Sequence, residues 1–146
     1  MKTNDTHKVA QNTLEDMRVS LKLKLASLWA SVMFLIIYLD YFHLYMPSKI
    51  NEIQTGKVFQ FEITQGFLIV AFTSVTIPAL MIFLSVALKA KVNRWTNIII
   101  ATLYIPFVLF NLAGDVWIHM VIGAIIEVVL FCLVIHFAWN WPRVKK

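Results

Sequence analysis

Four long apolar stretches constrain this chain most, because each is long enough to cross a lipid bilayer as a helix. A spanning helix needs about 20 mostly apolar residues. The stretches cover 25–46, 66–88, 95–114 and 116–141. The second and third contain no charged residue, whereas the first contains Asp40 and the fourth contains Glu127. The sequence therefore predicts an all-α membrane protein with four transmembrane helices.

The composition excludes the main soluble alternatives. Hydrophobic residues make up 60% of the 146 residues and charged residues only 14%, whereas an average soluble domain is about 45–50% apolar and about 25% charged. A soluble fold of this size would leave a large apolar patch on its surface. The same figures exclude a disordered chain. Cys132 is the single cysteine, which excludes an internal disulfide framework.

The connections between the apolar stretches predict how the helices are arranged. Short links at 89–94 and 114–115 force consecutive helices to run antiparallel, so we expect an up-down four-helix bundle. The other segments are an N-terminal segment at 1–24, a longer loop at 47–65 and a tail at 142–146.

The distribution of basic residues predicts the orientation. Of the 13 Lys and Arg residues, eleven fall in 1–24, 89–94 and 142–146, and only Lys49 and Lys57 fall in the loop 47–65. The positive-inside rule then places both termini in the cytoplasm and that loop outside it. The basic excess attracts anionic lipid. We expect no nucleic-acid partner, because the sequence has no basic face interleaved with aromatic residues.

Two segments outside the spans carry local patterns. Apolar residues at helical spacing over 14–28 predict that the first span begins as an amphipathic helix along the inner surface. The polar residues ahead of this span do not fit a cleaved signal peptide. In the outer loop, Ser48 and Gly56 flank a segment that predicts a short helix with a Ser cap and a Gly stop. Apolar and polar residues alternate over 58–63, shortly after this segment.

Polar residues inside the spans are the strongest functional signal. Ionisable groups at membrane depth cost about 2.5–3.5 kcal/mol on insertion scales and usually face the bundle interior. Residues spaced by four on the fourth span form one stripe, and Asp40 and His43 share a face of the first. The candidate ligand or proton site consists of Glu127, Asp40, His119, His43, Asp115 and Asn111.

Two interpretations of Glu127 remain open. In the first, Asp40, His43, His119 and Glu127 line a polar cavity that opens outward and holds a proton or a ligand. In the second, Glu127 is structural and hydrogen-bonds to a neighbouring helix. We expect no metal and no cofactor, because the His and carboxylate spacing matches no metal-binding motif and no Gly-rich phosphate loop occurs. No nucleophile has a base at a diagnostic spacing.

Two prolines predict bends in the middle spans. Pro78 and Pro106 each remove a backbone hydrogen bond and are expected to kink their helices. Thr76 and Thr102 are candidates to satisfy the freed carbonyl groups.

Several short motifs resemble a family of small bacterial four-span membrane proteins of unknown function. The resemblance covers about residues 14 to 142. It is carried by Tyr38-Leu39-Asp40, Ile77-Pro78-Ala79-Leu80-Met81, Leu84-Ser85, Asn93-Arg94-Trp95-Thr96-Asn97, Glu127 and Ala138-Trp139-Asn140-Trp141. Thr76 stands where the family's usual acidic residue precedes the Ile-Pro step, which argues against a carboxylate role there. The resemblance implies a bacterial inner membrane and implies no activity.

The segment before the third span has two interpretations. Arg94, Trp95 and Asn93 form either an anchor at the inner interface or a contact with a lipid headgroup or partner. The anchor is the simpler account.

The sequence favours a non-enzymatic membrane protein that binds a small molecule, lipid or proton between its helices. The first alternative is an accessory or scaffold protein, in which small residues contact a partner. The candidates are Ala26, Ser27, Ala30 and Ser31 on the first span, or Gly123 and Ala124 on the fourth. The second is a membrane enzyme that acts on a lipid or quinone through His43, His119 and Asp115. Four spans are few for a complete transport pathway, which favours a homodimer in the bilayer.

Overall fold

The computed structural model describes residues 19–58, 61–113 and 116–142. These residues form five α-helices and one small hairpin. The elements are α1 (Leu21–His43), α2 (Lys49–Gln54), β1 (Lys57–Val58), β2 (Phe61–Glu62), α3 (Gln65–Ala87), α4 (Ala90–Phe110) and α5 (Ile118–Trp139). Four of the helices have 21 to 23 residues and are apolar enough to cross a membrane. The all-α fold is therefore confirmed, and the chain is a multi-pass membrane protein.

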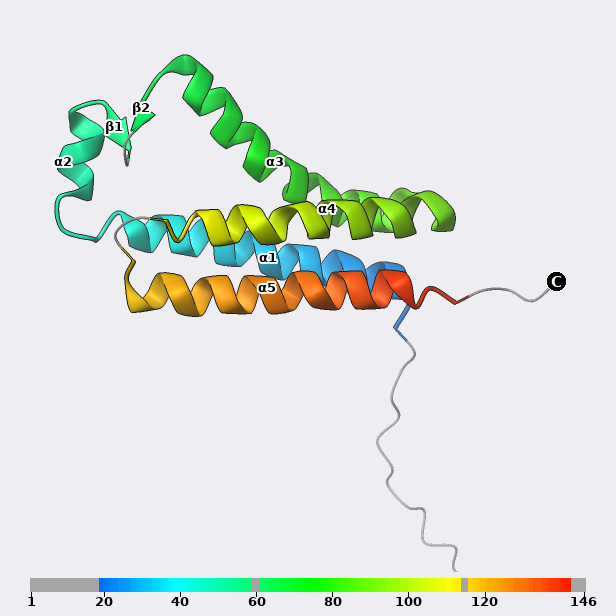
Figure 1. The fold of residues 1–146 in the computed structure, drawn as a ribbon. Helices are drawn as coiled ribbons and strands as arrows, with labels where there is room; N and C mark the ends of the chain where they lie inside the picture. The colour runs from blue at the N-terminus through cyan, green and yellow to red at the C-terminus, as the bar shows by residue number, and fades with distance from the viewer. Residues whose placement is uncertain (1–18, 59–60, 114–115, 143–146) are drawn as a thin grey trace, which may run out of the picture.

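The long helices form a bundle in which neighbours run antiparallel (Figure 1). Helix α1 packs against α3 and α5, and α4 packs against α5. We call the end that carries α2 and the hairpin the loop end, and the opposite end, where α1 begins and α5 finishes, the terminal end. Figure 1 shows α3 leaning away from the other helices near the loop end and joining them toward the terminal end. Side chains such as Leu68, Val70 and Phe72 in its first half are accordingly exposed.

The helix boundaries differ from the predicted spans in one place that matters. The link predicted at 89–94 is mostly helix, because α4 begins at Ala90. Hydropathy misses this first turn and a half because Lys91, Asn93 and Arg94 are polar, although a helix end near the membrane surface accommodates polar side chains. Asn93, Arg94 and Trp95 therefore belong to a helix and not to a loop. The amphipathic helix predicted over 14–28 lies partly outside the described residues, and α1 itself begins at Leu21.

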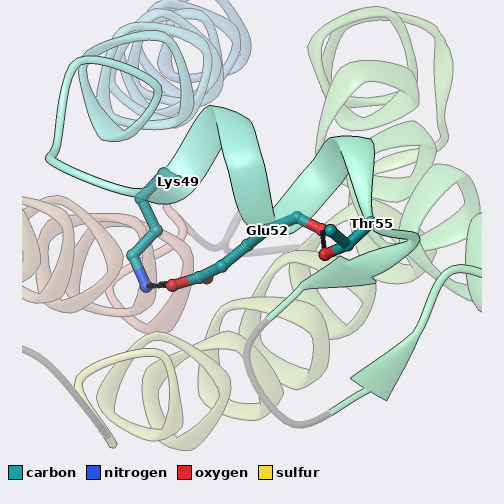
Figure 2. A network of polar contacts seen from close by, with 3 residues as sticks. All are labelled: Lys49, Glu52 and Thr55. Atoms are coloured by element: carbon teal, nitrogen blue, oxygen red, sulfur yellow. Dashed lines mark hydrogen bonds and ion pairs between the residues drawn. The ribbon is translucent and has the colours of Figure 1, made fainter.

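The loop-end segment folds as a short helix followed by a hairpin. In α2, Lys49 Nζ lies 3.1 Å from a carboxylate oxygen of Glu52, and the Thr55 hydroxyl donates to the Glu52 carbonyl at 2.8 Å (Figure 2). The predicted side-chain cap at Ser48 is wrong, because Ser48 has φ 69° and its side chain makes no capping bond. Gly56, at φ 78°, supplies the left-handed turn after α2 that glycine adopts without strain.

The alternating segment 58–63 is not one strand. It contributes to two antiparallel strands, in which Lys57 pairs with Glu62 and Val58 pairs with Phe61.

The proline in α3 is compensated from another helix. Pro78 has no N–H, so the carbonyl of Ser74, four residues earlier, loses its helical partner. The Tyr104 hydroxyl on α4 donates to that carbonyl at 2.5 Å. Thr76 instead donates to the carbonyl of Phe72, so the prediction that Thr76 satisfies the freed group is wrong. A bond from α4 thus stabilises the interrupted turn of α3.

The centre of the bundle is aromatic. Trp29, Tyr104 and Phe131 come from α1, α4 and α5, and their ring centroids lie 5.8 to 6.5 Å apart. Trp29 and Phe131 are fully buried. These rings fill the interior between α1, α4 and α5.

Candidate functional site

Glu127 lies on the buried face of α5. Its side chain is only 5% exposed, and the same face buries Gly123 one turn toward the loop end and Phe131 one turn toward the terminal end. Gly123 lies directly against Leu39 of α1, because a Cβ at this position would be 2.5 Å from the Leu39 methyl groups. The spacing by four places Glu127 at the contact between α1 and α5.

Asp40 of α1 is the charged neighbour of Glu127. The two carboxyl groups are close enough to interact electrostatically. Asp40 is exposed on the surface of α1, whereas Glu127 is buried where α5 packs against α1. We call Asp40 and Glu127 the carboxyl pair. Within the described residues, neither carboxyl group makes a hydrogen bond or a salt bridge.

The predicted histidines both lie at the loop end, at the end of α1 and the start of α5. His43, the last residue of α1, interacts electrostatically with His119 of α5 and with Lys49 and Glu52 of α2. The Nε2 atom of His119 is buried and has no hydrogen-bond partner among the described residues. This cluster lies on the loop-end side of the carboxyl pair, because His43 follows Asp40 on α1 and His119 precedes Glu127 on α5.

Two of the predicted site residues do not join this arrangement. Asn111 is exposed at the end of α4, and its backbone N–H caps that helix. Asp115 lies outside the described residues. Among the residues that the structure describes, no three His, Cys, Asp or Glu side chains are grouped so that they could hold a metal ion.

A buried amide cluster in the terminal half was not predicted as a unit. Asn97 Oδ1 accepts from Trp29 Nε1 at 2.7 Å and from Ser85 Oγ at 3.3 Å. Asn97 Nδ2 donates to Asn93 Oδ1 at 2.6 Å, and Asn93 Nδ2 donates to the Ser85 carbonyl at 2.5 Å. These bonds join α1, α3 and α4. The sequence signal is the pair of asparagines four residues apart in an apolar helix, but their partners are distant in the chain.

This cluster corrects one prediction about Asn93. A headgroup contact requires an exposed side chain, and Asn93 is fully buried with its amide bonded inside the bundle. Arg94 and Trp95 behave differently, since Arg94 is half-buried and Trp95 is exposed. The Arg94 guanidinium lies 5.5 Å from the ring centroid of Trp95 and 5.6 Å from that of Trp139 on α5.

Comparison with known proteins gives a family but no activity. The sequence model of a family of unknown function, DUF6326, matches residues 14–146. No curated protein and no solved structure matches the chain.

Proposed function

Because the chain belongs to DUF6326, a family of unknown function, we propose its function from its geometry: it binds a proton or a monovalent cation at the carboxyl pair. The observation that carries this proposal is the electrostatic interaction of two carboxyl groups, Asp40 on α1 and Glu127 on α5, neither of which has a basic partner among the described residues.

The charge of the pair requires a positive partner. Two carboxylates close together repel each other, and a buried carboxylate without a hydrogen bond is poorly solvated. The nearest alternatives in a protein interior, an Arg or Lys side chain, are not paired with either group in the described part of the chain. A proton or a small cation removes both costs at once.

The surroundings support binding from one side. The aromatic cluster of Trp29, Tyr104 and Phe131 lies on the terminal-end side of Glu127, and the Tyr104 hydroxyl is already bonded to Ser74. On the loop-end side, Asp40 is exposed and His43 and His119 follow. This arrangement favours reversible binding from the loop end and disfavours conduction through the bundle.

Labelling with dicyclohexylcarbodiimide tests the proposal directly. This lipid-soluble reagent reacts with protonated carboxyl groups in apolar surroundings. We expect the full chain in liposomes to be labelled at Glu127, as mapped by peptide mass spectrometry, and we expect labelling to fall as the pH rises. If sodium or potassium at constant pH slows the labelling, the ligand is the cation, and if only pH changes it, the ligand is the proton.

Matched variants separate the pair from other carboxyl groups. Glu127→Gln should abolish the label, and Asp40→Asn should change its dependence on pH or salt because the neighbouring charge is gone. Glu62→Gln, which removes an exposed carboxyl group from β2, should behave as the wild type. A label that never appears at Glu127, or that responds identically in Asp40→Asn, contradicts the proposal.

The two alternatives find less support. In the scaffold interpretation, Gly123 and Ala124 are buried within this bundle, whereas Ser27 and Ser31 of α1 are exposed and their hydroxyl groups donate to carbonyls of their own helix. The enzyme interpretation relies on His43, His119 and Asp115, and Asp115 lies outside the described residues. The bacterial inner membrane, the cytoplasmic termini and a homodimer remain part of the proposal. The first rests on the family resemblance, the second on the distribution of basic residues, and the third on the small number of spans.

A further inference from the structure

The cations at the terminal end have no acidic counterpart in the described part of the chain. The acidic residues described are Asp40, Glu52, Glu62 and Glu127. All lie in the loop-end half, since even Glu127 is the tenth of the 22 residues of α5. The described basic residues of the terminal end are Lys22, Lys24, Lys89, Lys91 and Arg94. The described charges at this end are therefore all positive, which favours an anionic ligand there.

Arg94 is held in a fixed position within this end. Its guanidinium contacts Trp95 of its own helix and Trp139 of α5. Its Nε atom is buried and has no hydrogen-bond partner among the described residues, and the guanidinium forms no ion pair there either. We call Arg94, Trp95 and Trp139 the arginine clamp. A guanidinium that faces aromatic rings keeps its Nη donors available for a planar or tetrahedral oxyanion.

Two further features point to the same kind of ligand. Lys91 is exposed one turn before Arg94 and Trp95 on α4, so it lies on the same side of the helix. The N-cap residue of α4, Lys89, offers no side-chain acceptor to the first-turn N–H groups. Free N–H groups at a helix N-terminus attract anions.

We propose that the arginine clamp and Lys91 bind the phosphate of an anionic phospholipid headgroup. Trp95 and Trp139 are 47% and 59% exposed, and tryptophans at this depth lie at the headgroup level of a bilayer. The acyl chains would then run along the exposed apolar side chains of α4 and α5, such as Ile99 and Leu133. A soluble phosphate would make no use of these apolar side chains. The carboxyl pair lies elsewhere, so this proposal does not depend on the proposed function.

Native mass spectrometry of the full chain tests the site. The protein is purified from nanodiscs that contain equal parts of phosphatidylcholine and phosphatidylglycerol, and the lipids that stay bound are counted. We expect the wild type to retain phosphatidylglycerol in preference to phosphatidylcholine. Arg94→Gln should weaken phosphatidylglycerol binding about tenfold, the usual effect of losing a charged hydrogen bond. Arg94→Lys should recover only part of it, since lysine lacks the fork of donors.

The controls decide between charge, fold and ligand source. Lys57→Gln removes the same charge at the loop end and should leave retention unchanged. Circular dichroism checks the fold of each variant, and Arg94→Lys and Trp139→Leu test the clamp if Arg94→Gln unfolds. Equal retention by wild type and all three clamp variants, or equal retention of both lipids, overturns the proposal. Displacement of the lipid by inorganic phosphate, with phosphate remaining bound, overturns the assignment to a lipid.

Discussion

Asn97 joins three helices in the half of the bundle near the terminal end. Its amide accepts from Trp29 on α1 and from Ser85 on α3, and it donates to Asn93 on its own helix. All four side chains are fully buried. In a bilayer there is little hydrophobic drive to hold one helix against another, so such bonds select which faces meet.

Asn97→Ala should lower the free energy of unfolding by about 1–2 kcal/mol, because it leaves the buried Trp29 N–H without its acceptor. Titration of the micelle-bound protein with sodium dodecyl sulfate, followed by circular dichroism, measures the change. Thr96→Ala is the matched control, since Thr96 is half-buried beside Asn97 and has no side-chain hydrogen bond in the described part of the chain. Equal stability of the two variants would show that the amide cluster does not contribute.

At the scale of the element, a hydrogen bond from α4 replaces a backbone hydrogen bond that α3 lacks. Pro78 leaves the Ser74 carbonyl without its helical donor, and the Tyr104 hydroxyl of α4 donates a hydrogen bond to it. Substitutions of Pro78 and Tyr104 are therefore expected to be coupled. A residue with a backbone N–H at position 78 should make the Tyr104 hydroxyl dispensable.

Tyr104→Phe alone should destabilise the protein by about 0.5–1.5 kcal/mol, the usual contribution of one hydrogen bond. In the background of Pro78→Ala, whose N–H can bond to Ser74 again, the same change should cost much less. A double-mutant cycle from unfolding titrations gives the coupling energy. Strict additivity of the two changes would refute the compensation.

The contact between α1 and α5 depends on a residue without a side chain. A Cβ at Gly123 would lie 2.5 Å from Leu39, whereas one at Gly66 would meet only Thr64 Oγ1 at 3.8 Å. The first glycine lets the two helices approach beside the carboxyl pair, and the second has no such role.

Gly123→Ala should therefore destabilise the bundle by about 1–3 kcal/mol, the range seen for overpacking. Gly66→Ala, near the start of α3, is the control and should be tolerated. Shortening the opposing side chain in Gly123→Ala/Leu39→Ala should recover part of the loss. If Gly123→Ala and Gly66→Ala melt alike, the close approach is not required.

At the scale of the whole molecule, the even number of spans and the basic residues together predict one orientation. Two exposed lysines lie at opposite ends of the bundle, Lys57 in β1 and Lys89 between α3 and α4. Both positions are suitable for measuring the orientation, because each lysine can be replaced by cysteine once Cys132 is removed.

In a Cys132→Ala background, Lys57→Cys should react with a membrane-impermeant maleimide in intact cells. Lys89→Cys should react only after the membrane is opened, because the positive-inside rule retains its end of the bundle in the cytoplasm. Gel shifts after labelling report both. The reverse labelling pattern would show that the orientation is opposite to the predicted one. Equal reaction of both sites in intact cells would disprove a single orientation.

Local patterns in the sequence were enough to predict several features. Four apolar stretches predicted four spanning helices, and spacing by four placed Gly123 and Glu127 on one face of α5. The extra turns at the start of α4 were missed because hydropathy averages penalise the polar residues of Ala90–Asn93, which a helix end tolerates. The cap at Ser48 was misjudged because its backbone is left-handed, whereas a capping serine adopts an extended conformation.

By itself, the sequence determined that this chain is an all-α membrane protein, since length and polarity along one segment decide whether that segment can cross a bilayer. Only the tertiary structure decided which polar groups meet. Trp29 bonds to Asn97 across 68 residues, Tyr104 to Ser74 across 30, and the Arg94 guanidinium lies between two tryptophans from different helices. Such pairings depend on how the helices rotate and approach one another, and the periodicity of a single helix carries no information about its neighbour.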